Sequence, residues 1–191
     1  MLPFKALCPI LIALVVTTLA PKVKAETFDR EVSKFVSGPG TLIYLGSGVT
    51  LPLLLDPKEG KQRALRTLDS LGSSTIACIA LKKVTRVQRP DSDSNDSFPS
   101  CHATAAFAVA TVQSHYNPDS AFLWYSGATL ISYSRLNLNR HRISEVLAGA
   151  ALGYLTAKLE LSQKRGLILF PFIHSNEDEQ PIVGLQVMGS F

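Results

Sequence analysis

The chain has 191 residues, a length that suits one domain with a substantial hydrophobic core. Its formal net charge is +4, but Lys5, Lys22 and Lys24 lie in the first 25 residues, so the remainder of the chain is nearly neutral. This balance excludes a globally basic nucleic-acid-binding protein, and we expect no nucleic-acid partner.

The first 25 residues are typical of a secretory signal. Lys5 provides the positive start, residues 6–20 form an uncharged apolar run, and Val23-Lys24-Ala25 resembles a small-residue cleavage site. We therefore expect residues 1–25 to be a signal peptide and residues 26–191 to form one exported domain in the periplasm or bacterial envelope. The alternative is a retained membrane anchor, although the run is shorter than the ~20 residues that a spanning helix needs.

The rest of the chain is predicted to be mainly helical up to about residue 161. Residues 35–55 are apolar but contain several glycines and prolines, which favours a buried, broken helix over a membrane-inserted segment. Residues 58–61 form a polar turn. Apolar periodicity predicts further helices over residues 63–83, 100–114, 120–133 and 144–161.

Two features of the last helix concern its start and its packing. Ser144 is the expected N-cap, and Glu145 lies in the first turn, where the helix dipole favours a carboxylate. Gly149 and Gly153 are four residues apart, which allows a second helix to approach closely.

The C-terminal tail differs from the helical part of the chain, because residues 166–173 and 182–188 are rich in β-forming residues on either side of a polar linker. We expect a β-hairpin over residues 166–191.

One cluster of residues suggests covalent phosphoryl transfer. His141 lies between Arg135 upstream and Glu145 downstream. A guanidinium grips phosphate oxygens as a planar fork, a histidine can attack phosphorus, and a carboxylate can orient the imidazole.

Two upstream clusters add the parts of an anion site. Lys82 is followed after six residues by Arg89-Pro90, and the second cluster is Pro99-Ser100-Cys101-His102 at the start of a predicted helix. The N–H groups at a helix N-terminus bind anions, and His102 could donate a proton there.

At these positions the chain resembles the type-2 phosphatidic-acid phosphatase and vanadium haloperoxidase superfamily. The family pattern is Lys-x6-Arg-Pro, then Pro-Ser-Gly-His, then Ser-Arg-x5-His-x3-Asp, and the resemblance covers about residues 60–160. Cys101 stands where the family has glycine, and Glu145 stands where it has aspartate. The resemblance implies a helical bundle, here with the C-terminal hairpin appended.

The resemblance also implies the role of each motif residue. His141 would be the nucleophile, Glu145 would orient it, and His102 would act as the proton donor. The phosphate would be bound by the remaining motif positions, Lys82, Arg89, Ser100, Cys101 and Arg135. No metal is implied, and no cluster has zinc-ligand spacing.

The implied function is a metal- and cofactor-independent phosphatase acting through a phosphohistidine. Its substrate would be a phosphorylated small molecule or a lipid or isoprenyl phosphate, with peripheral membrane contact. One alternative is a haloperoxidase, in which vanadate takes the place of phosphate. Another is a non-catalytic envelope module with a decayed site.

Two features remain open from the sequence. Cys78 and Cys101 are either buried free thiols, which is the favoured interpretation, or a disulfide formed in an oxidising compartment. The Asp- and Ser-rich segment 89–98 is either a flexible connector or the rim of an active site.

Overall fold

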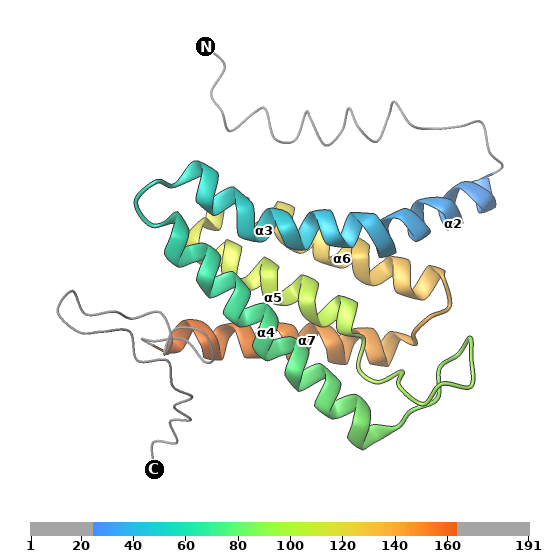
Figure 1. Cartoon of the computed structure of the whole chain (residues 1–191). Coiled ribbons are helices and arrows are strands. Elements are labelled where there is room, and N and C mark those ends of the chain that lie inside the picture. Colours follow the sequence, from blue (N-terminus) through green and yellow to red (C-terminus); the bar gives the residue numbers. More distant parts are fainter. Residues whose placement is uncertain (1–24, 164–191) are drawn as a thin grey trace.

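Long helices with short connections make up residues 25–163, the part of the chain that the computed structural model describes (Figure 1). No strand occurs in this part, so the expected mainly helical bundle is confirmed. The predicted signal peptide, apart from Ala25, and the predicted hairpin lie outside the described residues. In chain order the elements are α2 (Ala25–Phe35), a π-helical turn η2 (Val36–Gly40), α3 (Thr41–Leu55), α4 (Gly60–Thr85), α5 (Cys101–Tyr116), a 3-10 turn η3 (Pro118–Ser120), α6 (Ala121–Asn137) and α7 (Ile143–Ser162).

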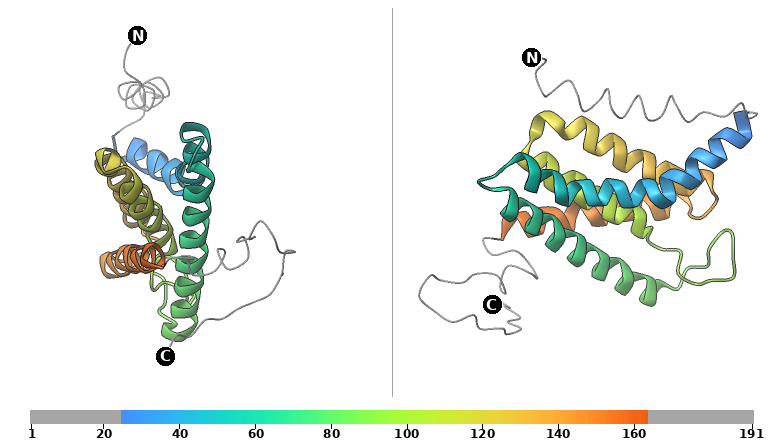
Figure 2. Two further views of the ribbon diagram at one scale, coloured as in Figure 1. Left: turned by 90° about the vertical axis from the view of Figure 1, so that its left-hand side faces the viewer. Right: turned by 45° about the horizontal axis from the view of Figure 1, so that its top comes forward.

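Helix α5 is the centre of the bundle and packs against α3, α4, α6 and α7. Seen along the bundle, α4 lies on one side and α6 and α7 lie on the other (Figure 2). The sequence of α5 explains this position, because most of its side chains are small or β-branched and are buried, for example Ala106, Ala110 and Val112. A helix that is apolar on all sides is stable only when other helices surround it.

Helix α7 approaches α5 through its two glycines. A Cβ atom at Gly149 would lie 2.4 Å from the carbonyl oxygen of Ser100, and one at Gly153 would lie 2.0 Å from that of Thr104. Neither distance is possible for a real side chain, so the predicted close approach of a helix at these glycines is confirmed.

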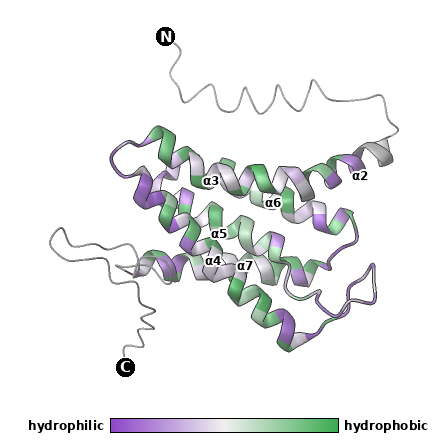
Figure 3. Ribbon diagram, viewed as in Figure 1, coloured by the Kyte–Doolittle hydropathy of each residue, from purple (hydrophilic) through white to green (hydrophobic). Residues whose placement is uncertain are grey.

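The predicted buried helix over residues 35–55 is wrong in its burial. In α3, Leu42 is 73% exposed and Leu54 is 75% exposed, while the buried positions are Thr41, Gly48 and Pro52. Apolar residues also recur along α3 and α4 (Figure 3). Asp29–Leu55 is the one helix in the described part of the chain that is long and apolar enough to cross a membrane.

Two further expectations about the helices are corrected. The N-cap of α7 is Arg142 rather than Ser144, because the Glu145 carboxylate reaches back and accepts the Arg142 N–H at 3.0 Å. Cys78 and Cys101 form a disulfide, so the favoured interpretation as free thiols is wrong. This bridge ties α4 to the first residue of α5.

Candidate active site

All three motifs meet at one end of the bundle, the right-hand end in Figure 1. Lys82 lies in the last turn of α4, and Arg89 lies in the loop that follows. Ser100 is the N-cap of α5, with Cys101 and His102 in its first turn. Arg135 lies in the last turn of α6, and the connection from α6 to α7 carries His141. The helix termini therefore gather side chains that are far apart in the sequence.

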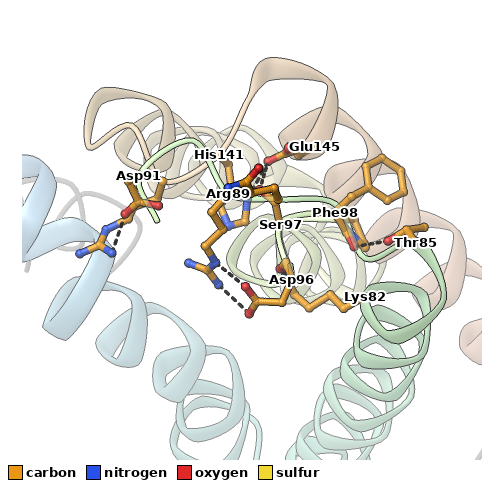
Figure 4. Close-up of polar contacts among 12 residues, drawn as sticks. Lys82, Thr85, Arg89, Asp91, Asp96, Ser97, Phe98, His141 and Glu145 are labelled. Atoms are coloured by element: carbon orange, nitrogen blue, oxygen red, sulfur yellow. Dashed lines mark hydrogen bonds and ion pairs between the residues drawn. The ribbon is translucent and has the colours of Figure 1, made fainter. Parts of the chain in front are cut away.

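The His141 imidazole is held from one side. Its Nδ1 lies 3.1 Å from Glu145 Oε2, and Ser97 Oγ donates to the same carboxylate oxygen at 2.5 Å (Figure 4). His141 lies just before the N-cap Arg142, and Glu145 in the first turn of α7 reaches back to it. A carboxylate at Nδ1 favours the tautomer that carries its proton there, which leaves the Nε2 lone pair free to act as a nucleophile.

Glu145 is itself fixed by neighbouring groups. Its carboxylate accepts the Arg142 N–H and, at 2.9 Å, the Arg142 guanidinium. Its carbonyl oxygen accepts the Ser100 N–H at 3.0 Å, which links the start of α7 to the start of α5. The orienting carboxylate and the expected phosphate cradle are therefore parts of one hydrogen-bonded unit.

Lys82 and Arg89 both contact Asp96, which comes from the loop between α4 and α5. The Arg89 guanidinium forms a two-point contact with the Asp96 carboxylate, at 2.6 and 3.0 Å (Figure 4). The Lys82 ammonium donates to the Asp96 carbonyl oxygen. Of these two cations, both expected to bind phosphate, Arg89 is thus ion-paired with Asp96 and Lys82 contacts the backbone of the same residue.

Arg135 and His102 share a neighbour from the N-terminal helix. The Arg135 guanidinium donates to the Ser37 hydroxyl, and the Ser37 backbone lies near enough to His102 to oppose the fall in the pKa of that histidine. Ser37 is in the π-helical turn between α2 and α3, and both it and Arg135 are buried. The N-terminal helix therefore contributes directly to the surroundings of two motif residues.

Burial and positive neighbours keep both motif histidines neutral. Burial, followed by the charge of Arg135, lowers the pKa of His102 to about 4. Burial also lowers the pKa of His141, against the opposing hydrogen bond from Glu145. A neutral imidazole at His141 has the lone pair that nucleophilic attack requires.

The pKa values of the charged partners follow their contacts. Burial raises the pKa of Glu145, but hydrogen bonds from Ser97, from Arg142 and from His141 outweigh it and leave the carboxyl below its usual range. Burial lowers the pKa of Arg135 to about 10, and nearby arginines add to the effect. Glu145 and Arg135 are therefore both charged at neutral pH.

Two buried polar atoms in this region have no hydrogen-bond partner among the described residues. They are Ser100 Oγ and Arg135 Nε, and each belongs to a position expected to bind phosphate. Buried polar atoms are seldom left unpaired in proteins. An oxyanion would satisfy both, since a hydroxyl and a guanidinium can each donate to it.

The sequence predicted the histidines, the arginines and Lys82 at this end of the bundle, and the structure places them there. The Cys101 side chain forms the disulfide, which does not affect its expected contribution, because that comes from its backbone N–H in the first turn of α5, where no helical partner is needed. Contacts from Asp96, Ser97, Arg142 and Ser37 were not anticipated individually. The segment 89–98 contacts the motif residues, which favours the active-site rim over a flexible connector.

Known proteins with related sequences or folds include phosphatases of lipids. A lipid A 1-phosphatase of Porphyromonas gingivalis is 45% identical over 76 residues, which cover 37% of this chain and only 17% of that protein. The crystal structure of Aquifex aeolicus LpxE matches 83% of this chain and 96% of its own, with a TM-score of 0.58 and 24% identity.

A second solved structure has the same fold. It is a transmembrane PAP2-type phosphatidylglycerolphosphate phosphatase from Bacillus subtilis, which matches 71% of this chain and 78% of its own at a TM-score of 0.54 and 22% identity. Residues 63–167, more than half of the chain and including all three motifs, match the PAP2 superfamily. The motifs, the helical bundle and this match together show that the chain belongs to the PAP2 superfamily.

Proposed function

We propose that this protein is a membrane-associated phosphatase that hydrolyses the phosphate monoester of a lipid through a phosphohistidine. One observation carries the proposal: a buried, neutral His141 is hydrogen-bonded through Nδ1 to the ionised Glu145, at the point where the three motifs converge. Membership of the PAP2 superfamily supports phosphatase chemistry at this point.

In the first step, Nε2 of His141 attacks phosphorus and forms an N–P bond. The bond from phosphorus to the leaving oxygen breaks, and His102 gives that oxygen its proton from the protonated form, which is the minor form in the free protein at neutral pH. Arg135, Lys82 and Arg89 stabilise the negative charge on the transferring oxygens, together with the N–H groups at the start of α5. Because phosphoryl transfer depends mainly on positioning and charge, a pocket rich in cations suits it.

In the second step, water attacks the phosphorus of the phosphohistidine. Neutral His102 takes a proton from the water, the N–P bond breaks, and inorganic phosphate leaves. Glu145 stabilises the positive charge that His141 carries in the intermediate. Both histidines then regain the protonation states from which the cycle began.

A lipid substrate is supported by the relatives and by the surface of the bundle. The curated relative acts on lipid A, and the Bacillus subtilis neighbour acts on phosphatidylglycerolphosphate. Helix Asp29–Leu55 would keep the protein at a membrane, with the site at the end of the bundle. Export through the predicted leader would place this site at the outer face of the membrane.

The test is hydrolysis of lipid phosphates by the purified protein in detergent micelles, compared with p-nitrophenyl phosphate. His141→Ala should abolish phosphate release, and 32P from labelled substrate should be trapped on the wild-type protein as an acid-labile adduct. Wild-type turnover by His141→Ala would exclude this mechanism. No hydrolysis of any substrate by the wild type would instead favour the non-catalytic alternative.

A control with EDTA addresses the cofactor. The described residues contain no group of three or more His, Cys, Asp or Glu side chains arranged to hold a metal ion. The proposed chemistry uses only protein groups, so hydrolysis should continue in EDTA. Activity that is lost in EDTA and restored by a divalent cation would contradict this part of the proposal.

A further inference from the structure

We infer that Ser37, in the π-helical turn before α3, is a positioning residue for the phosphoryl-binding Arg135. Ser37 lies outside residues 63–167, the part of the chain that matches the PAP2 superfamily. The inference rests on the proposed function for its kinetic readout. Ser37 would add the turn between α2 and α3 to a site that is otherwise built from α4–α7 and their connections.

The contacts of Ser37 are to site residues on two different helices. Its hydroxyl accepts a hydrogen bond from the Arg135 Nη1–H on α6, and its backbone lies near enough to His102 on α5 to oppose the fall in the pKa of that histidine. The Ser37 side chain and Arg135 are both buried, at 8% exposure each. A guanidinium binds phosphate through a fixed fork of N–H groups, so a fixed acceptor at one corner determines which N–H groups face the substrate.

In the π-helical turn that contains Ser37, the backbone departs from the α-helical hydrogen-bonding pattern. In an α-helix the Thr41 N–H would donate to the Ser37 carbonyl, but here it donates to the Gly38 carbonyl. Pro39, inside the turn, has no N–H to donate. The Thr41 N–H, the usual α-helical donor, thus does not bond to the Ser37 carbonyl in this turn. Single π-helical turns are frequent at functional sites.

The N-terminal helix is held against α6 by a second contact one turn earlier. Asn137 Nδ2 donates to Ser33 Oγ at 2.8 Å and to the Asp29 carbonyl oxygen at 3.2 Å. Ser33 is buried like Ser37 and also accepts a side-chain hydrogen bond from α6. Its partner, however, is not a motif residue, so Ser33 offers a matched control for the purely structural part of this contact.

The experiment compares Ser37→Ala with Ser33→Ala in the full-length protein. Ser37→Ala should lower kcat/KM about tenfold and weaken inhibition by orthovanadate to a similar extent, because both depend on the orientation of the Arg135 fork. Ser33→Ala should stay within about twofold of wild type. Equal effects of the two substitutions would show that Ser37 only packs the helix.

A second pair of substitutions separates the effect of the Ser37 hydroxyl from the effect of side-chain size. Ser37→Thr and Ser37→Val give side chains of nearly the same shape, but only threonine keeps the hydroxyl acceptor, which valine replaces with a methyl group. Threonine should retain activity several-fold above valine at matched thermal stability, and equal activities would overturn the inference even if Ser37→Ala failed to fold. The effect should also disappear in an Arg135→Lys background, as expected for two residues that act through one contact.

Calorimetric binding of orthovanadate separates this inference from the proposed function. If the wild type hydrolyses no phosphate ester but Ser37→Ala still weakens orthovanadate binding about tenfold, the proposed function fails and the positioning role stands. If the wild type is active and both measurements are unchanged in Ser37→Ala, the positioning role fails and the proposed function stands.

Discussion

At the scale of single residues, Glu145 combines two functions in one carboxylate. It caps the start of α7 through the Arg142 N–H, and it is hydrogen-bonded to His141, which it orients in the proposed mechanism. The neutral amide of glutamine can still accept the Arg142 N–H, so Glu145→Gln should preserve the helix start while removing the charge that stabilises a positively charged His141. The sequence position four residues after His141 predicted this pairing correctly.

We expect Glu145→Gln to lower kcat about ten- to a hundredfold. This range corresponds to the loss of one charge-assisted hydrogen bond, about 1.5–3 kcal/mol. Steady-state kinetics and thermal unfolding of the variant are the two measurements. Unchanged kcat would mean that Glu145 is only a helix-capping residue, whereas a large fall in unfolding temperature would show that capping dominates.

If Arg89 binds the phosphate as proposed, Asp96 competes with the substrate for it. Its carboxylate is 48% exposed and forms the two-point contact that a phosphate would otherwise make. Asp96→Asn should therefore lower KM and strengthen inhibition by inorganic phosphate. Because exposed ion pairs contribute at most about 1 kcal/mol, we expect a change of up to about fivefold.

Asp91→Asn is the matched control for Asp96. Asp91 lies in the same loop but pairs with Arg140, at 2.7 Å, rather than with Arg89. Its substitution should leave KM close to the wild-type value. A rise in KM for Asp96→Asn would instead mean that the carboxylate orients Arg89 for substrate binding.

The lowered pKa of His102 predicts an acid-favoured reaction. A proton donor must be protonated, and with a pKa of about 4 the protonated fraction in the free protein falls about tenfold for each pH unit above that value. We expect kcat/KM to fall as the pH rises from about 5 to about 8. In His102→Ala this dependence should be lost, leaving only that of the substrate, and an unchanged pH profile would contradict the role of His102 as donor.

At the scale of elements, the two glycines of α7 set the distance to α5. We expect Gly153→Ala to destabilise the bundle by about 1–3 kcal/mol, because the added Cβ would overlap the Thr104 carbonyl and force the helices apart. Gly46→Ala on α3 is the control, since a Cβ there meets nothing within 4 Å, and alanine favours the helix by up to about 1 kcal/mol. Thermal unfolding distinguishes the two, and equal stability would contradict the close packing.

The helices themselves were predictable because their apolar periodicity and their glycine and proline breaks are local signals. The individual contacts within the site were harder to predict from the sequence. Ser97 and Asp96 lie in a loop of repeated Asp and Ser, where nothing in the pattern distinguishes one acidic or hydroxyl residue from the next. Ser37 is 98 residues from Arg135 in the sequence. Contacts of this kind depend on helix packing, which the family motifs do not encode.

At the scale of the whole molecule, the exposed apolar residues change the expected relation to the membrane. An apolar run interrupted by Gly and Pro looks the same in sequence whether it faces protein or lipid, which is why residues 35–55 were predicted to be buried. In the structure, Leu42 and Leu54 are exposed on α3. Exposed apolar surface of this extent on a helix long enough to span a bilayer favours lipid contact.

We therefore expect the full-length protein to remain with the membrane after washing with alkaline carbonate, which removes peripheral proteins, and to require detergent for release. N-terminal sequencing of the same material tests the leader, and a mature start near residue 26 is compatible with membrane insertion because the candidate span, Asp29–Leu55, follows that position. Replacing Leu42, near the centre of the span, with arginine should weaken retention in the membrane, since a charge there costs several kcal/mol, whereas arginine at Leu54, near the end of the span, should have a smaller effect. The same substitutions should leave the contacts of His141 unchanged, because both positions face away from the bundle. Release of the wild-type protein by carbonate would support peripheral contact instead. Something other than lipid would then have to bury the exposed apolar face of α3.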